Sequence, residues 1–185
     1  DESVIRDFET GDISVTTTIT PGYPNTEAGY HAFMDSLRAR TEALVINEIS
    51  NKNFSVLRDE DGEYSNWVEL KNSSDKELDL SAFALTDTMS KPIKWRFPRR
   101  ILGPGEYLLV FLSGKDKTGE QLHTSFRLAQ SETQLFLTTL NGKSTSSVTI
   151  PDTVKPDMSY GFAGQEWQVL RKPTPGFPNT PQGEA

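Results

Sequence analysis

The residues best suited to bind a ligand form an acidic stretch, Asp59-Glu60-Asp61-Gly62-Glu63. Carboxylates grouped around a glycine can supply the oxygen ligands that Ca²⁺ prefers. The stretch lacks the full spacing of an EF-hand loop and its distal bidentate glutamate, and Asp-Gly is also an ordinary turn dipeptide. Two interpretations therefore stand: a solvated turn, which we favour, and a weak calcium site formed by Asp59, Asp61 and Glu63.

A second group of candidate residues is basic and closely spaced. Its members are Lys91, Lys94, Arg96, Arg99 and Arg100. Lys94 and Arg96 share one face of an expected strand, so this basic cluster could bind phosphate, an anionic glycan or nucleic acid. The alternative, which we favour, is the solvated face of an edge strand, where Lys and Arg discourage aggregation.

Three tryptophans, Trp67, Trp95 and Trp167, could stack on sugar rings. Trp95 alternates with neighbouring apolar residues and is therefore expected in the core, and Trp167 is also interpreted as a core residue. Trp67 points away from Val68 and Leu70 on the same expected strand. If those two residues form the core face, Trp67 is partly exposed and is the best aromatic candidate for ligand binding.

Signatures of catalysis are weak throughout the sequence. Glu48 and Glu69 could be imagined as a glycosidase pair, but both fall within expected strands, so we interpret them as strand-surface residues that hydrogen-bond across a sheet. Neither His31 nor His123 accompanies a nucleophile motif such as G-x-S-x-G. Without cysteine, the chain also has no thiolate for a zinc site. We therefore predict a protein that is not an enzyme and has no cofactor beyond the weak Ca²⁺ site.

Composition narrows the possible partners. The chain has 185 residues and a formal net charge of −7, which disfavours broad binding to a nucleic-acid backbone because that binding needs a positive field. No apolar run approaches the ~20 residues of a membrane span, so we expect no membrane insertion. No signal peptide precedes Asp1, which suggests a mature or excised fragment.

The spacing of apolar residues predicts an all-β fold. From residue 43 onward, short alternating stretches are separated by turn signals such as Asn141-Gly142. Eight to ten short strands without a helix among them predict an antiparallel β-sandwich. Residues 27–40 carry the only helical stripe of apolar side chains, with Thr26 as N-cap, and are expected to form a helical linker.

One segment occurs twice. Residues 20–26 (Thr-Pro-Gly-Tyr-Pro-Asn-Thr) and residues 174–180 (Thr-Pro-Gly-Phe-Pro-Asn-Thr) agree at six of seven positions. We interpret this as an internal repeat, in which residues 1–26 are the last strands of a preceding copy or an N-terminal extension. Strands separated from their parent domain have unsatisfied edges, so we expect either a monomer or a strand-swapped dimer.

A set of motifs in a fixed order resembles the lamin tail domain as it occurs in bacterial extracellular proteins. These motifs are Ile46 to Ile49, Asp61 to Asn72, Leu78 to Ser81, Leu85 to Asp87, Lys94 to Pro98, Leu102 to Val110, Leu122 to Leu128 and Thr174 to Asn179. The resemblance implies an immunoglobulin-like sandwich over residues 41–180, followed by an exit linker at 181–185. Asn66 stands where the family often has Asp.

The resemblance also implies a kind of function. In the bacterial branch the domain is an accessory module of secreted or cell-surface proteins, occurs in tandem or beside catalytic domains, and has no shared catalytic residues. We therefore expect an extracellular, non-enzymatic module that mediates adhesion, spacing or the positioning of neighbouring domains, with a protein or cell-surface component as partner. The alternative is a module that binds a glycan or an anionic polymer through Trp67 and the basic cluster.

Overall fold

The computed structural model describes residues 3–6, 13–16, 20–24 and 26–179. The chain forms two compact units, Asp1–Thr41 and Glu42–Ala185. The predicted exit linker at 181–185 lies outside the described residues. Within the described ranges, no helix has the length and apolar character needed to cross a membrane.

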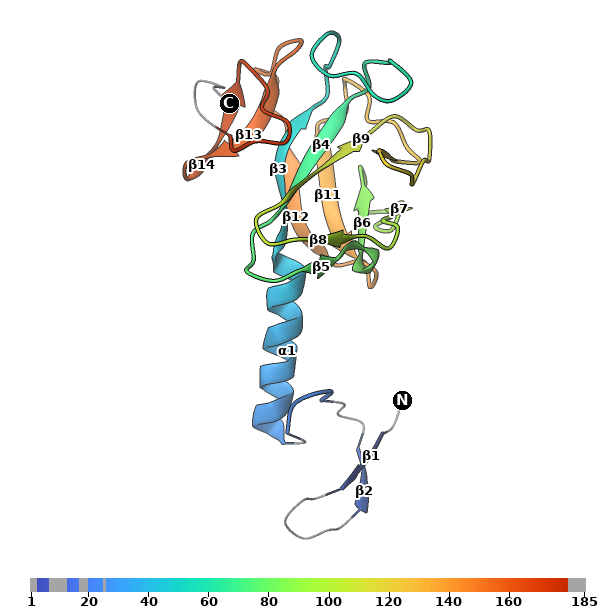
Figure 1. The fold of residues 1–185 in the computed structure, drawn as a ribbon, viewed down its shortest axis with the longest axis vertical. Helices are drawn as coiled ribbons and strands as arrows, with labels where there is room; N and C mark the ends of the chain where they lie inside the picture. Colours follow the sequence, from blue (N-terminus) through green and yellow to red (C-terminus); the bar gives the residue numbers. More distant parts are fainter. Residues whose placement is uncertain (1–2, 7–12, 17–19, 25, 180–185) are drawn as a thin grey trace. The chain divides into compact units, whose positions relative to one another are not determined.

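The first unit contains a strand pair and most of a helix. Strands β1 (Ser3–Arg6) and β2 (Ile13–Thr16) are antiparallel partners. Helix α1 spans Glu27–Glu42, close to its predicted bounds (Figure 1). It begins where expected because Thr26 Oγ1 accepts a hydrogen bond from Gly29 N at 3.0 Å, which satisfies one of the free amides of the first turn.

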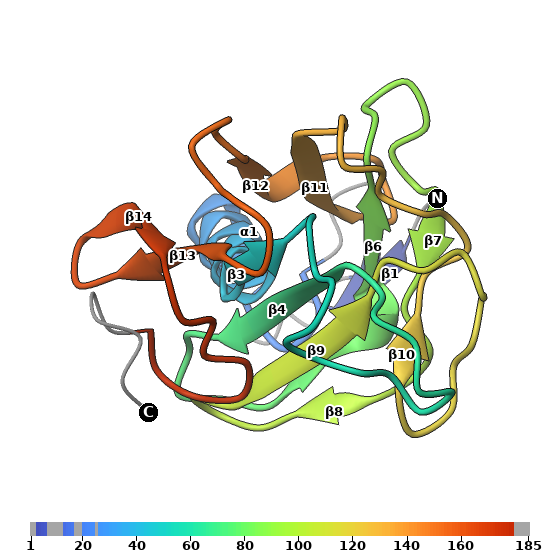
Figure 2. The same ribbon diagram turned by 90° about the horizontal axis from the view of Figure 1, so that it is seen from above.

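The second unit is a β-sandwich, as predicted, and its two main sheets form two layers in Figures 1 and 2. In sheet order, the six-stranded sheet consists of β10 (Leu122–His123), β9 (Tyr107–Phe111), β4 (Trp67–Asn72), β3 (Leu44–Ser50), β13 (Ser159–Ala163) and β14 (Glu166–Leu170). The four-stranded sheet consists of β12 (Ser144–Thr149), β11 (Gln134–Thr139), β6 (Phe83–Thr86) and β7 (Trp95–Arg96). A small pair, β5 (Leu78–Asp79) with β8 (Ile101–Leu102), and the 3-10 helix η1 (Leu80–Ala82) complete the unit.

The core is formed by apolar side chains of the two sheets. Val68 and Leu70 of β4 are fully buried in it, so the face that the alternation of β4 gave these two residues is the core face. Leu85 of β6 and Leu135 and Leu137 of β11 belong to the same core. Burial of apolar surface between two layers is the main stabilising contribution in such a fold.

Strand β3 contains a bulge at Asn47, which determines where the next side chain points. Ile46 pairs with Leu70 and Glu48 pairs with Glu69, so Asn47 is the extra residue between them. Without the extra residue, Glu48 would follow Ile46 onto the core face. The bulge instead places Glu48 beside Glu69 on the outer face of the six-stranded sheet.

Candidate functional site

Glu48 and Glu69 form a pair of buried carboxylates. They are directly opposed on adjacent antiparallel strands, and each residue is 0% exposed. The interpretation of both as strand-surface residues is therefore wrong. It failed because the outer face of this sheet is covered by chain that lies more than a hundred residues away in the sequence.

The segment that covers the carboxylates is Thr174–Asn179, here called the exit segment. Glu48 Oε1 accepts a hydrogen bond from Thr174 N at 3.1 Å, and Glu48 Oε2 lies 3.0 Å from Thr174 Oγ1. Glu48 also accepts a hydrogen bond from Ser159 Oγ. Glu69 accepts one from Gly176 N and one from Asn47 Nδ2, the latter at 2.7 Å. All four carboxylate oxygens are thus used within the chain.

Asn179 fastens the other end of the exit segment. Its Nδ2 donates to the backbone oxygens of Asn47 at 2.9 Å and Phe162 at 3.1 Å, and its Oδ1 lies 3.0 Å from Thr174 Oγ1. Gly161 permits this close approach, because a Cβ at that position would lie 2.6 Å from Asn179 Nδ2. We call Asn47, Glu48 and Glu69 the socket, since together they hold the exit segment.

Burial changes the titration of both acids. It raises the pKa of Glu48 despite hydrogen bonds from Ser159 and Thr174. It also raises the pKa of Glu69, to about 7, although Gly176 and Asn47 donate to this carboxylate. The adjacent Glu48 adds to the shift, because two like charges at close range disfavour double ionisation. The socket is therefore a set of hydrogen-bond acceptors for the chain itself, with no carboxylate oxygen left over for a glycosidase reaction.

The predicted calcium ligands converge on a lysine. Lys115 Nζ lies 2.6 Å from Asp59 Oδ2, 2.7 Å from Asp61 Oδ2 and 3.0 Å from Glu63 Oε2. Lys117 adds a second ammonium group, 2.7 Å from Asp61 Oδ2. The position predicted for the cation is therefore filled by Lys115. No group of three or more His, Cys, Asp or Glu residues suited to a metal ion occurs among the residues that the structure describes.

This acidic loop is a structural turn held together by charge. Burial alone would raise the pKa of Asp59, but hydrogen bonds from Lys115, Glu63 N and Ser65 Oγ outweigh it and lower the pKa. The Lys115 and Lys117 ammonium groups lower the pKa of Asp61 to about 2. The loop thus matches the favoured interpretation in being a turn, and its carboxylates are neutralised by two lysines that the sequence did not connect with it.

Three members of the basic cluster already contact acidic or carbonyl oxygens of the chain itself. Lys94 Nζ lies 2.6 Å from Asp87 Oδ2. Arg99 Nε is 3.9 Å from Asp79 Oδ2, and Arg100 Nη1 donates to the Glu120 carbonyl at 3.1 Å. Of the five members, Lys91, Arg96 and Arg99 are exposed, and Lys94 and Arg100 are half-buried. The cluster therefore offers a weaker anion site than its sequence suggested.

Trp67 is fully buried, at 0% exposure, so the prediction of a partly exposed ring is wrong. Its side chain does point away from Val68 and Leu70, as expected, but that face is covered too. Its cross-strand neighbour Phe111 is buried as well and stacks on His123 with ring centroids 5.1 Å apart. A ring so enclosed has no face open to a sugar.

The family of the chain follows from its match to a family model. The model of the Lamin Tail Domain matches residues 38–152. The chain belongs to the lamin tail domain family. A search of curated proteins found no match. Lamin tail domains are immunoglobulin-like interaction modules without catalytic activity, which agrees with the sandwich observed here. The match corresponds to a single domain.

The matched range of the lamin tail domain ends before β13, β14 and the exit segment. These parts nevertheless belong to the sandwich, because β13 pairs with β3 in the centre of the six-stranded sheet. Gly161 of β13 lies directly opposite Glu48. The socket is therefore formed inside the matched range, whereas the segment that fills it lies beyond that range.

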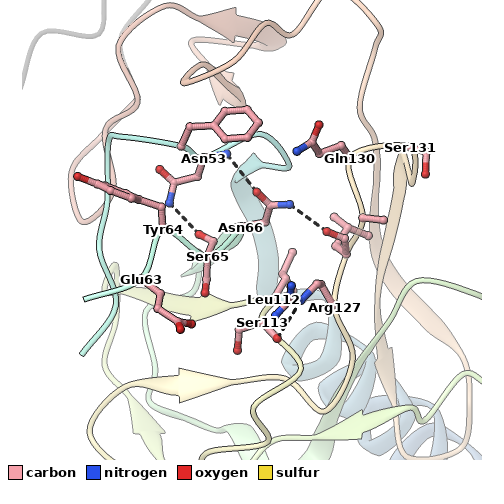
Figure 3. Close-up of a pocket in the computed structure, with 13 residues that line it drawn as sticks. Asn53, Glu63, Tyr64, Ser65, Asn66, Leu112, Ser113, Arg127, Gln130 and Ser131 are labelled. Atoms are coloured by element: carbon pink, nitrogen blue, oxygen red, sulfur yellow. Dashed lines mark hydrogen bonds between the residues drawn. The ribbon is translucent and has the colours of Figure 1, made fainter. Parts of the chain in front are cut away.

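Asn66, where this lamin tail domain departs from the family pattern, lies in a pocket of about 570 Å³ (Figure 3). Its Oδ1 accepts a hydrogen bond from Asn53 N at 3.1 Å, and its Nδ2 donates to the Leu128 carbonyl at 2.9 Å. An ionised Asp could not make the second bond, because it has no donor. The Asn66 amide thus bridges the loop before β4 to the loop before β11.

A second pocket of the lamin tail domain, of about 540 Å³, has three aromatic residues, Tyr107, Phe162 and Trp167, among polar and aliphatic ones in its lining. Trp167 is half-buried there, stacked on Tyr160 at 5.2 Å and edge-on to Phe162 at 6.0 Å. Tyr107 and Lys71 also line this aromatic pocket. Trp167 was expected in the core, and it does pack against the core, but only partly buried. The rest of its ring is open because β14 is an edge strand of the six-stranded sheet, which the alternation of apolar residues along the hairpin could not reveal.

The two histidines form no catalytic group. His123 is fully buried, with Nδ1 2.9 Å from Ser113 Oγ, and its Nε2 lies 3.9 Å from Glu60 Oε1. Burial lowers the pKa of His123, so the ring is neutral at pH 7. His31 lies on α1, 3.9 Å from Glu27. A buried serine against a buried imidazole gives a substrate no access.

Proposed function

We propose that this lamin tail domain is a structural module that fixes the direction in which the chain enters and leaves it, and so spaces or positions neighbouring segments. The main support for the proposal is the socket, in which two buried carboxylates bind the exit segment. Taking a carboxylate out of water is costly. Five donor groups offset that cost here.

Hydrogen bonds also fix the chain at the start of the domain, which supports the same function. The carbonyl of Ala43, the residue just before β3, accepts hydrogen bonds from Ser73 N and Ser73 Oγ, both at 2.8 Å. Ala43 itself is buried. The chain is therefore fixed by hydrogen bonds immediately before its first strand in the sandwich and again at Asn179, after its last.

An electron spin resonance distance measurement tests this function. Because the chain has no cysteine, Lys143→Cys and Phe177→Cys would introduce the only thiols for two spin labels, one on the Asn141-Gly142 turn and one on the exit segment. We expect a single narrow distance distribution, which broadens in the Glu48→Ala, Glu69→Ala background. A broad distribution in the parent protein would contradict a positioning function. The matched control is Glu166→Ala, an exposed acid on β14.

The aromatic pocket favours a second candidate function, binding of a glycan. Trp167, Phe162 and Tyr107 could stack on a sugar ring, and Lys71 lies 5.2 Å from the centroid of Tyr107. A glycan array probed with the parent protein and with Trp167→Ala tests this candidate. Selective binding that disappears in the variant would establish it. With a net charge of −7, nucleic acid is the less favoured anionic partner.

The biological setting belongs to the proposal as well. By resemblance to bacterial members of the family, we propose a secreted or cell-surface protein that contacts a protein or another component of the cell surface. We also retain tandem copies of the domain, and a monomer or a strand-swapped dimer, as proposals. The recurrence of the exit segment at residues 20–26 supports the tandem arrangement.

A further inference from the structure

The two copies of the repeated segment adopt the same turn. Phe177 N donates to the Thr174 carbonyl at 3.0 Å, and Tyr23 N donates to the Thr20 carbonyl at 3.0 Å. The glycines at the third position have φ angles of 87° and 79°. Proline followed by a glycine of positive φ is the pattern of a type II turn. Residues 20–24 thus already have the conformation that the socket holds at 174–178.

The chain before each turn is also similar. The exit segment follows the antiparallel pair β13–β14, and residues 20–24 follow the antiparallel pair β1–β2. Val15 of β2 and Val169 of β14 occupy equivalent places, because each lies five residues before the threonine of its turn. The resemblance therefore extends from the turn to the hairpin that leads into it.

Within the exit segment, the socket contacts only groups that both copies possess. Glu48 binds the backbone N–H and the hydroxyl of a threonine, and Glu69 binds the N–H of a glycine. Residues 20–22 supply the same threonine, proline and glycine. The single difference, Phe177 against Tyr23, falls at a position that is 56% exposed in the exit segment. Nothing in the hydrogen bonding of the socket distinguishes the two sequences.

We propose that the socket is a recognition site for the sequence Thr-Pro-Gly-aromatic-Pro-Asn, and that it accepts residues 20–25 of a second copy of the chain in place of its own exit segment. The contact would link copies head to tail, with the leading segment of one molecule in the socket of the next. This inference goes beyond the positioning function and does not rest on it.

The exit segment of a molecule competes with residues 20–25 of a second copy for the same socket. The exit segment is tethered to its own socket, which gives it a high effective concentration. Residues 20–24 must also give up their present contacts. Thr20 is buried, its hydroxyl donates to the Tyr23 carbonyl at 3.4 Å, and the rings of Tyr23 and Phe33 lie 6.0 Å apart. Exchange is therefore a minor state of the parent protein, and it becomes the major state when the exit segment is weakened.

The first test asks whether the socket accepts the leading sequence at all. Phe177→Tyr makes residues 174–179 identical to residues 20–25 and disturbs no hydrogen bond of the socket. We expect a melting temperature within about 1 °C of the parent, since surface substitutions are usually nearly neutral. A fall of about 5 °C or more would mean that the socket rejects the leading sequence, and would overturn the proposal.

The second test measures the exchange with the full chain. Thr174→Val with Asn179→Ala weakens the exit segment, and the probe is a labelled, end-capped peptide of residues 18–28. We expect the double variant to bind this peptide at least tenfold more tightly than the parent does. The control peptide carries Gly22→Val, because a β-branched residue strongly resists a positive φ. Equal binding of both peptides, or none to a folded variant, would overturn the proposal.

Light scattering completes the test without a peptide. The Thr174→Val, Asn179→Ala variant should shift toward dimers or longer assemblies as its concentration rises, and adding Gly22→Val to it should restore the monomer. Assembly that persists with Gly22→Val would mean that another surface causes it, and would contradict the proposed contact. If the double variant does not fold, the single variant Asn179→Ala, which keeps the bonds between Thr174 and Glu48, replaces it against the same two peptides, with the same outcomes for and against the proposal.

Discussion

Glu48 and Glu69 lie directly opposite each other on β3 and β4, fully buried, on the face of the sheet that points away from the sandwich core. Each holds a different end of the Thr-Pro-Gly turn: Glu48 binds Thr174 and Glu69 binds Gly176. Two adjacent carboxylates could not remain there without such donors, because like charges and burial both oppose ionisation. The pair therefore explains why the exit segment returns to the centre of the sheet.

Removing one carboxylate should release the exit segment. Glu69→Ala leaves Gly176 N and Asn47 Nδ2 without their acceptor, and we expect it to lower the free energy of unfolding by about 1–3 kcal/mol. Urea denaturation measures the change. Glu166→Ala, which removes an exposed acid, is the matched control and should stay within about 0.5 kcal/mol of the parent. Equal changes in unfolding free energy for Glu69→Ala and Glu166→Ala would show that Glu69 does not stabilise the exit segment.

Stability should depend on pH through Glu69. Its folded-state pKa of about 7 lies above the ordinary value of 4.5, so the stability it contributes is fully present below pH 4.5 and is lost as pH rises through 7. The loss is on the order of 3 kcal/mol at most. Glu69→Gln cannot titrate, so the difference in unfolding free energy between variant and parent should move in favour of the variant across this window. A constant difference from pH 4.5 to pH 8 would contradict the raised pKa.

Lys115 should be essential to the acidic loop, and its removal should create the cation site that the sequence suggested. Lys115→Met leaves the buried Asp59 without its counter-ion, and we expect a loss of about 3–5 kcal/mol. Lys117→Met, which removes a more exposed ammonium group, should lower the free energy of unfolding far less, because exposed ion pairs contribute little to stability. Thermal denaturation with millimolar Ca²⁺ should raise the melting temperature of Lys115→Met and leave the parent unchanged. Stabilisation of the parent by Ca²⁺ would show that Lys115 does not exclude the ion.

Trp67 and Trp167 should differ in how much they contribute to stability. Trp67→Ala empties a fully enclosed volume, and we expect it to lower the unfolding free energy by about 3–5 kcal/mol. Trp167→Ala, at a half-buried position of the aromatic pocket, should cost about 1–2 kcal/mol. Chemical denaturation of the two variants side by side measures both. A smaller loss of unfolding free energy for Trp67→Ala than for Trp167→Ala would contradict the full enclosure of Trp67.

The fold could be predicted from the sequence because its signals are local. Alternation along β4 correctly put Val68 and Leu70 on one face, which is the core face, and Thr26 correctly marked the start of α1. The sandwich followed from many short strands and turn signals. Each of these inferences needs only residues that are close together in the sequence, because side chains of a strand alternate between its faces every two residues and those of a helix repeat every three to four.

The site could not be predicted, because the contacts that decide it join residues far apart in the sequence. Glu48 and Thr174 are 126 residues apart, and Asp59 and Lys115 are 56 residues apart. The bulge at Asn47 also breaks the alternation that would have shown where Glu48 points. For Trp67, the alternation gave the correct face, but it carried no information on what covers that face. Two sequence signals did point to the exit segment: its recurrence at residues 20–26 and its place among the motifs that resemble the lamin tail domain.

Amide hydrogen exchange at Gly176 is the most direct test of whether the socket holds the exit segment. Gly176 lies in a turn with an exposed neighbour, Phe177, so its N–H would exchange rapidly unless the Glu69 carboxylate holds it. We expect strong protection of Gly176 N and Thr174 N in the parent protein, with Gly176 protection lost in Glu69→Ala and kept in Glu166→Ala. Exchange of Gly176 N in the parent at the rate of an unstructured peptide would show that Glu69 does not hold the exit segment.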